Sequence, residues 1–200
     1  MPRPKTHDDA LRVRLLDRAG ELLSGEGPDA LSLRRLAADV GTSTTAVYSL
    51  FGGKPALVRE LYVDAFHRFG SRLTQVSLSG DPAEDLVQLG LAYRRAALAE
   101  PHLYLIMFTK AVAGFEPDNE TAAHVLGPMV EVGRLAGLPD PETAAMTVWG
   151  LVHGLVSLEL NGNLTDAGHV ERVLRAGLAG FSVSVAVQRT ASAVVSGSSG

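Results

Sequence analysis

Leucine and alanine recur at helical spacing in the first part of the chain. Over residues 8–24 the spacings of three and four residues place the apolar side chains on one stripe, which predicts an amphipathic helix. The segment Gly25-Glu26-Gly27-Pro28 then ends this helix. The stripe consists of Leu11, Leu15, Leu16, Ala19, Leu22 and Leu23.

Two short helices follow, each with a recognisable start and stop. Ser32 is a good N-cap for a helix over Leu33–Val40, and Gly41 suits the left-handed residue that ends one. Ser43 can cap a second helix over Thr44–Phe51, which Gly52-Gly53 breaks. The residues expected to face inward are Leu33, Leu36, Ala37 and Val40 in the first helix, and Ala46, Val47, Leu50 and Phe51 in the second.

The remainder of the chain is also predicted to be helical. A long helix starts at Lys54-Pro55, with proline in its first turn, and buries Leu57, Leu61, Ala65, Phe69 and Leu73. Further helices are expected over residues 82–100, 101–113, 119–136, 141–160 and 166–187, before a flexible Ser/Gly tail. The pattern therefore predicts an all-α fold of about nine helices. Residues 1–54 form an N-terminal three-helix domain, residues 55–190 a C-terminal helical domain, and residues 191–200 the tail.

Composition narrows the classes of protein without naming one. Cysteine is absent, which excludes a disulfide framework and thiolate chemistry and fits a cytoplasmic location. The basic N-terminus has no apolar region behind it, so it is not a signal peptide. The most apolar stretch, Ala144–Leu158, is shorter than a membrane span, and we expect it to be a buried core helix. Net charge is −4, concentrated after residue 60, so any contact with nucleic acid is confined to a small surface.

The helix over Thr44–Phe51 carries the candidate chemistry. Thr44, Thr45 and Ser49 point away from its buried residues, and short hydroxyl and methyl groups can read base edges in a major groove. Tyr48 and Lys54 flank this surface and are placed to hold phosphates. Two short helices joined by Gly41-Thr42-Ser43 have the proportions of a helix-turn-helix, although a plain surface hairpin of helices would have the same topology.

A family resemblance favours the first alternative. The stretch from Leu31 to Leu57 resembles the DNA-binding motif of the TetR (tetracycline repressor) family, with departures at Thr42 and at Gly52-Gly53. The matching positions are Ser32, Ala37, Gly41, Ser43, Val47, Tyr48, Phe51 and Lys54. The resemblance implies a cytoplasmic transcriptional regulator, a repressor that a small molecule releases from a palindromic operator. It implies DNA contacts from Arg34, Ser43, Thr44, Thr45, Tyr48, Ser49 and Lys54. Arg3 and Lys5 form either an arm into the adjacent groove or a solvated tail.

The helix over Pro141–Leu160 carries a second motif. Its Trp149, His153 and Gly154 resemble the C-terminal subclass named for a Trp…His-Gly pattern. Gly150 and Gly154 stack one turn apart and lower helix propensity, so another helix is expected to approach them closely. With Gly177 and Gly180 on the next helix, this predicts a homodimer through the last two helices. His153 is either a hydrogen-bonded core histidine or a ligand contact.

The resemblance also implies an effector pocket in the C-terminal domain, for a small and largely apolar molecule. Its expected lining is aromatic and flexible apolar side chains with a few polar tips, although any one of them can be simple core. The candidates are Tyr93, Leu103, Tyr104, Met107, Phe108, Met146, Trp149 and His153.

Two other classes of protein were weighed. A helical di-iron enzyme needs paired Glu-x-x-His repeats, and the sequence has none; other catalytic motifs, phosphate loops and clustered histidines are also missing. We therefore expect no catalytic residue, no metal site, no cofactor and no membrane partner. A helical adaptor that binds only protein is the third alternative.

Overall fold

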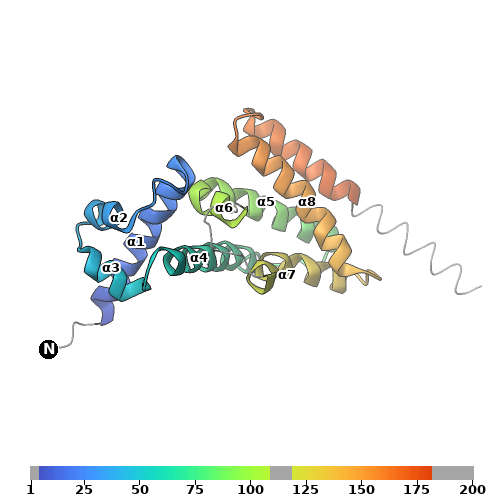
Figure 1. Cartoon of the computed structure of the whole chain (residues 1–200). Helices are drawn as coiled ribbons and strands as arrows, with labels where there is room; N and C mark the ends of the chain where they lie inside the picture. The colour runs from blue at the N-terminus through green and yellow to red at the C-terminus, as the bar shows by residue number, and fades with distance from the viewer. Residues whose placement is uncertain (1–4, 109–118, 182–200) are drawn as a thin grey trace, which may run out of the picture. The chain divides into compact units, whose positions relative to one another are not determined.

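The computed structural model describes residues 5–108 and 119–181, and within these residues it contains helices and turns but no strand (Figure 1). The helices are α1 (Lys5–Glu26), α2 (Leu33–Val40), α3 (Thr44–Phe51), α4 (Lys54–Thr74), α5 (Pro82–Ala99), α6 (Pro101–Phe108), α7 (Asn119–Leu135) and α8 (Pro141–Leu160). A last helix covers residues 167–181. The predicted all-α class is confirmed. Residues 109–117, 182–187 and the tail, which carry other predictions, lie outside the described residues, as does Arg3.

The chain divides into two compact units. Unit 1 comprises residues 1–68 and 100–121, and unit 2 comprises residues 69–99 and 122–200. Helix α4 is continuous from Lys54 to Thr74 and therefore contributes residues to both. The predicted domain boundary at residue 54 follows the sequence motif and stays a prediction.

Unit 1 has a leucine-rich core. The whole predicted stripe of α1 is buried, with Leu15 and Leu22 fully inaccessible, and Leu36 of α2 and Leu57 of α4 close the same core. Helix α6 packs against α1. A methyl group added at Gly20 of α1 would lie 3.1 Å from the His102 ring, so the small residue permits this close approach.

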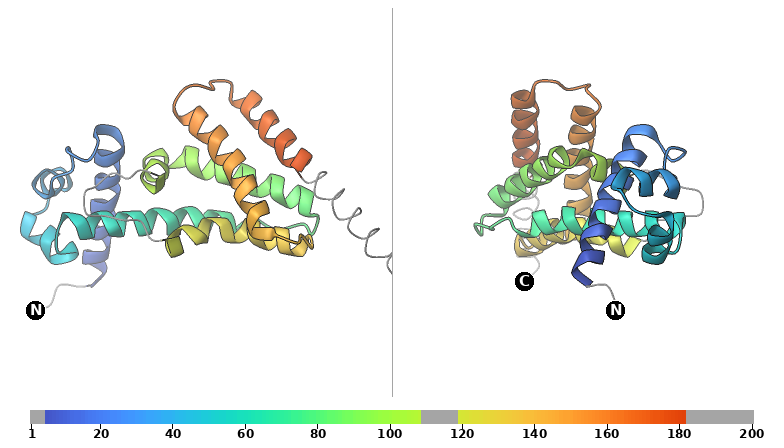
Figure 2. Two further views of the ribbon diagram at one scale, coloured as in Figure 1. Left: turned by 45° about the vertical axis from the view of Figure 1, so that its right-hand side comes forward. Right: turned by 90° about the vertical axis from the view of Figure 1, so that its left-hand side faces the viewer.

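Unit 2 is built around α5, which packs against α8. Gly90 of α5 lies against Leu178 of the last helix. The Leu178 side chain occupies the space that a Cβ at position 90 would need. Helix α8 and the last helix lie side by side, joined by a turn after Leu160 (Figures 1 and 2). Gly177 meets Leu151 of α8, with 2.8 Å from its virtual Cβ to a leucine methyl. The expectation that Gly177 faces a second subunit is therefore wrong, because its close contact lies within the chain.

The expectation that α8 is a buried core helix is only half right. Its buried residues in this chain, Ala145, Val148, Val152 and Val156, form one stripe, while Met146 and Leu158 are 50% and 43% exposed. Among the described residues, α8 is the one helix long and apolar enough to cross a membrane by length and composition, and only 22% of that window is buried. A wide apolar face of α8 is thus left uncovered by the other residues that the structure describes.

A buried ion pair joins three elements of unit 2. The Arg94 guanidinium on α5 donates to both carboxylate oxygens of Glu159 on α8, at 2.7 and 2.6 Å, and to the backbone carbonyl of Ala167 at 3.2 Å. Both side chains are only 10% exposed. The hydrogen bond to Glu159 raises the pKa of Arg94, against the effect of burial. The pair therefore fixes the turn between α8 and the last helix to α5.

Breaking this pair should destabilise the protein. Arg94→Met leaves the Glu159 carboxylate buried without its partner, and we expect the free energy of unfolding to fall by about 3–5 kcal/mol. Arg134→Met is the matched control, since Arg134 pairs with Glu131 at 69% exposure, and should change stability by less than about 0.5 kcal/mol. Urea unfolding followed by circular dichroism, at one protein concentration, measures both. Equal effects of the two substitutions would contradict the role of the pair.

Candidate functional site

The turn between α2 and α3 is fixed by local hydrogen bonds. The Ser32 hydroxyl accepts from the Arg35 amide at 3.2 Å, which starts α2. Gly41 ends it with φ of 73°, a left-handed conformation that glycine adopts without steric cost. The Ser43 hydroxyl then accepts from the Ala46 amide at 3.1 Å and starts α3. Both predicted caps and the predicted stop are confirmed, so the two short helices have the predicted bounds.

Helix α3 has a clear inner and outer face. Val47 and Phe51 are buried, whereas Ala46 and Leu50, also expected to face inward, are only half-buried. On the outer face, Thr45, Tyr48 and Ser49 are exposed and follow the spacing of three and four residues that places side chains together. Within the part of the chain that the structure describes, none of these three side chains has a hydrogen bond. Thr44 is half-buried beside them.

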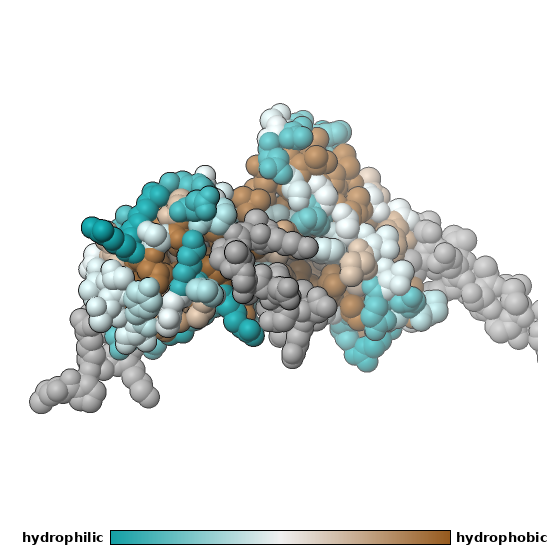
Figure 3. All heavy atoms as spheres, in the orientation of Figure 1, coloured by the Kyte–Doolittle hydropathy of each residue, from teal (hydrophilic) through white to brown (hydrophobic). Residues whose placement is uncertain are grey.

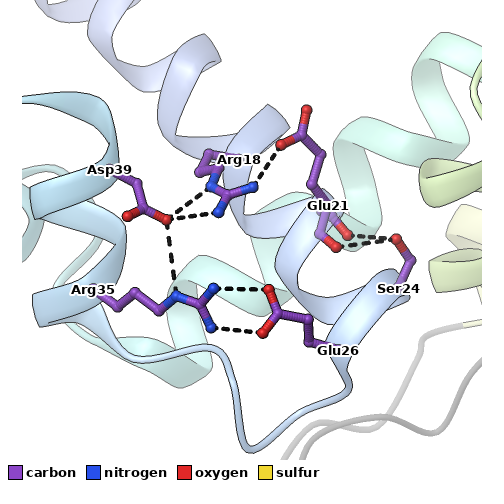
Figure 4. A network of polar contacts seen from close by, with 7 residues as sticks. Arg18, Glu21, Ser24, Glu26, Arg35 and Asp39 are labelled. Atoms are coloured by element: carbon purple, nitrogen blue, oxygen red, sulfur yellow. Dashed lines mark hydrogen bonds and ion pairs between the residues drawn. The ribbon is translucent and has the colours of Figure 1, made fainter.

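An ion-pair network connects α2 to α1 (Figure 4). Arg35 donates to both carboxylate oxygens of Glu26, at 2.8 and 2.7 Å, and this lowers the pKa of Glu26. Arg18 donates to Asp39 at 2.8 Å and to Glu21 at 2.9 Å. These side chains are partly exposed to solvent, so each ion pair contributes little to the free energy of unfolding. The pair with Glu26 nevertheless gives the Arg35 guanidinium a carboxylate partner within the chain. The two pairs that join the helices, Arg35 with Glu26 and Arg18 with Asp39, have no signal in the sequence pattern, because their partners lie on different elements.

Arg34, next to Arg35, is in the opposite situation. Its side chain is exposed and makes no ion pair with any residue in the described ranges, so its charge is available to an external anion. Lys54 is half-buried, and its ammonium group donates to the Pro28 carbonyl at 2.8 Å. This hydrogen bond links the turn before α2 to the start of α4. The predicted phosphate contact would be a second role for the same side chain.

Three of the predicted effector residues come together in unit 2. Trp149 Nε1 donates to the Tyr93 hydroxyl at 3.2 Å, and His153 Nδ1 lies 3.4 Å from the same hydroxyl. His153 Nε2 lies 3.4 Å from the Ser157 hydroxyl. The Trp149 and His153 rings are 5.2 Å apart, and burial lowers the pKa of His153. We call Tyr93, Trp149, His153 and Ser157 the tyrosine–histidine cluster.

The other predicted lining residues do not join this cluster. Leu103, Tyr104 and Met107 on α6 are buried in unit 1. Phe108 is 37% exposed and packs edge-on against Tyr104, with ring centroids 5.0 Å apart. Met146, in unit 2, is half exposed. The predicted effector residues are thus divided between the two units. Those on α6 contribute mainly to the hydrophobic core of unit 1.

Comparison with known proteins agrees with these two parts. Residues 15–61 match the sequence model of bacterial regulatory proteins of the tetR family, and residues 86–181 match that of the tetracyclin repressor-like C-terminal domain. A capped helix-turn-helix followed by this helical body defines a DNA-binding transcriptional regulator. The chain belongs to the TetR family.

Relatives of known sequence point the same way. The chain is 26% identical over 171 residues to an uncharacterised HTH-type transcriptional regulator of Mycobacterium tuberculosis, Rv0681, with 82% of this chain and 78% of that protein aligned. It is 27% identical over 149 residues to the HTH-type transcriptional repressor DrrR1 of Streptomyces coeruleorubidus, covering 74% of this chain and 53% of the repressor.

Solved structures share the fold. The proposed regulatory protein SCO4313 is 28% identical, with a TM-score of 0.73 over 90% of this chain and 100% of that one. A protein of unknown function from Rhodococcus sp. RHA1 is 27% identical, with a TM-score of 0.73 over 88% and 95%. A TetR variant of Acinetobacter baumannii AYE, in complex with minocycline, is 21% identical, with a TM-score of 0.60 over 88% and 96%, and shows the fold alone.

Proposed function

We propose that this regulator is a homodimeric repressor that leaves a palindromic operator when a small molecule binds its C-terminal domain. The observation that carries the DNA-binding part is the outer face of α3, where Thr45, Tyr48 and Ser49 are exposed and make no side-chain hydrogen bond to any described residue. The similarity to the repressor DrrR1 supports repression. The proposed domains are residues 1–54 for reading, 55–190 for sensing and dimerisation, and a tail over 191–200.

The roles on DNA follow the chemistry of each side chain. Thr44, Thr45 and Ser49 contact base edges, with Ser43 beside them as the N-cap of α3. Tyr48, Arg34 and Lys54 contact phosphates, which sets the register of the helix in the groove without reading sequence. The contrast between Arg34 and Arg35 supports this division, because Arg35 is paired with Glu26 whereas Arg34 has no ion pair among the residues that the structure describes.

The tyrosine–histidine cluster is the proposed effector site. It offers flat apolar rings with a few polar atoms, which suits a small and largely apolar molecule. The hydrogen bonds of His153 agree with a core histidine, and Tyr93 is fully buried, so a direct ligand contact belongs first to Trp149, which is partly exposed. The second motif, Trp149 with His153-Gly154, is the basis for assigning the protein to the Trp…His-Gly subclass.

Two features support coupling between effector and operator. Helix α4 begins at Lys54, next to the reading helix, and contributes residues to both units. Helix α6, which carries the other predicted pocket residues, packs on α1 of the reading domain at Gly20. A ligand that favours one arrangement of these helices changes operator affinity.

The proposed dimer surface is the uncovered apolar face of α8 together with the last helix. Figure 3 shows apolar residues at the surface over these two helices; Met146, Leu158 and Val173 are exposed there. A Cβ at Gly150 or Gly154 would meet nothing within 4 Å among the described residues, which leaves room for a partner helix. Because α8 also holds the Glu159 carboxylate, which is only 10% exposed, we assign the apolar face of α8 to a second subunit rather than to lipid. Membership of a family of DNA-binding regulators is the basis on which we assign the protein to the cytoplasm and expect no enzymatic activity.

DNA recognition can be tested by paired substitutions. Thr45→Ala should relax base preference at one operator position, at a cost of about 1–3 kcal/mol. Lys54→Ala should weaken binding to all sequences alike and flatten the salt dependence by about one unit. Selection from random DNA, with affinities measured at several salt concentrations, separates the two effects. An unchanged binding preference for both Thr44→Ala and Thr45→Ala would place the reading surface elsewhere.

Dimerisation can be tested at two glycines that differ in their surroundings. Gly154→Leu places a side chain in space that no described residue of the same chain fills, so it should separate the subunits while leaving the fold intact. Gly177→Leu would instead strike Leu151 of its own chain and should lower stability. Light scattering and thermal unfolding measure both. A Gly154→Leu protein that stays dimeric with wild-type stability would overturn the proposed surface.

Effector release predicts reciprocal affinities. Coupling of this kind is typically about 1–3 kcal/mol, so the effector should lower operator affinity about 5- to 150-fold, and the operator should weaken effector binding by the same factor. Trp149 is the only tryptophan, so its fluorescence can be used to screen apolar compounds. Tyr93→Phe removes the hydroxyl that accepts from Trp149 and should alter the response. Equal effector affinity with and without operator would exclude the proposed switch.

A further inference from the structure

A groove lies between the C-terminal end of α4, with the residues that follow it, and the second half of α5, within unit 2. Its volume is about 550 Å³, in the range of small-molecule sites. Arg72, Gln75, Gln88 and Arg95 contribute polar atoms to its lining. Ala92 and Ala96, both buried, contribute an apolar surface. The groove therefore combines an apolar floor with hydrogen-bond donors.

This groove is separate from the tyrosine–histidine cluster. Helix α5 turns Gly90 and Arg94 toward α8 and the last helix. Ala92 and Arg95 lie on the groove side of α5. Ala92 and Arg94 are two residues apart, which is about 200° around the helix. The two faces of α5 thus serve different neighbours, and a molecule in the groove lies on the face turned away from α8.

The charge of the groove is unusual for this protein. Two arginines line it and no aspartate or glutamate does, although the whole chain carries a net charge of −4. Arg95 is exposed and has no hydrogen bond or ion pair to any residue that the structure describes. Arg72 has another interaction, but a guanidinium has five N–H donors and can serve a second acceptor. Gln88 donates to Glu84 one turn away, at 2.6 Å, and this leaves its carbonyl and second N–H unused by that bond.

We propose that this groove is a second small-molecule site, for an amphipathic monocarboxylate. Its carboxylate pairs with Arg95 and Arg72, and its apolar part lies on Ala92 and Ala96. Arginine is suited to this role because its planar fork matches two carboxylate oxygens. A mixed floor of methyl groups and amides accepts a short alkyl chain or an aromatic ring but offers little to a compact inorganic anion. This inference is independent of DNA binding and of the proposed effector site.

The test uses the full-length protein without DNA. Octanoate, benzoate and 1-naphthoate are titrated by calorimetry, with octanol as the uncharged counterpart of octanoate. We expect at least one acid to bind saturably, at one per chain, and octanol to bind much more weakly. Arg95→Ala should weaken the acid about 10- to 100-fold, as expected for losing a hydrogen bond to a charged group. Arg95→Lys should keep part of the affinity.

Two further variants control for charge and for location. Arg134→Ala removes the same charge from an exposed site on α7, outside the groove, and should leave acid affinity unchanged. Ala99→Trp fills the groove from an exposed position and should abolish binding while the protein keeps its helicity. Saturable binding that survives both Arg95→Ala and Ala99→Trp would overturn the proposal. Equal affinity for octanol, or no saturable binding of any of the three acids, would also overturn it.

Discussion

The reading surface of this regulator depends on one tight reversal of the backbone, at Gly41-Thr42-Ser43. The left-handed Gly41 stops α2, and the Thr42 amide donates back to the Ala37 carbonyl at 2.8 Å. Ser43 then restarts the chain as α3. With only two turns available, α3 must bury Val47 and Phe51 to stay docked. The opposite face of α3 consequently packs against no other described part of the chain. A helix that reads base edges needs such an exposed face.

The packing of unit 2 depends on α5, as the outer face of α3 depends on the turn at Gly41. Gly90 lets the last helix approach closely, and Arg94 ties Glu159 and the Ala167 carbonyl to the same helix. A buried charge pair is weak evidence for net stability, because taking both charges out of water costs about as much as their attraction returns. Its partners here are on α5, at the end of α8 and at the start of the last helix, so it joins these three elements at one point. Because α5 also carries Tyr93 and Arg95 on its other faces, the same ion pair sets the positions of the tyrosine–histidine cluster and of the groove.

Sequence reasoning succeeded where the interactions are local. Caps such as Ser32 and Ser43 bond a backbone amide three residues on, so their geometry can be read from spacing, and the bounds of α2, α3 and α8 were predicted correctly. It failed where partners lie far apart in the chain. Glu26 with Arg35 and Arg94 with Glu159 carry no periodic signal, and the glycine ridge that includes Gly177 looked like a subunit contact although Leu151 of the same chain fills it. Of the predicted effector residues, Tyr93, Trp149 and His153 lie together in unit 2, whereas those on α6 lie in unit 1, and the sequence pattern did not predict this division.

The arginines show why context, rather than charge, distinguishes a binding surface. Arg18, Arg35 and Arg94 are matched to carboxylates within the chain and serve the fold. Lack of a partner is not sufficient to mark a site, because Arg14 and Arg172 are also without an ion pair among the described residues. Arg34 and Arg95 differ in where they lie: the first is exposed on α2, the helix that precedes the capped helix α3, and the second lies in a groove with an apolar floor and no carboxylate in its lining. The two proposals assign a phosphate backbone to Arg34 and an amphipathic acid to Arg95, so that in both cases the neighbours of the arginine, and not its charge alone, decide the class of partner.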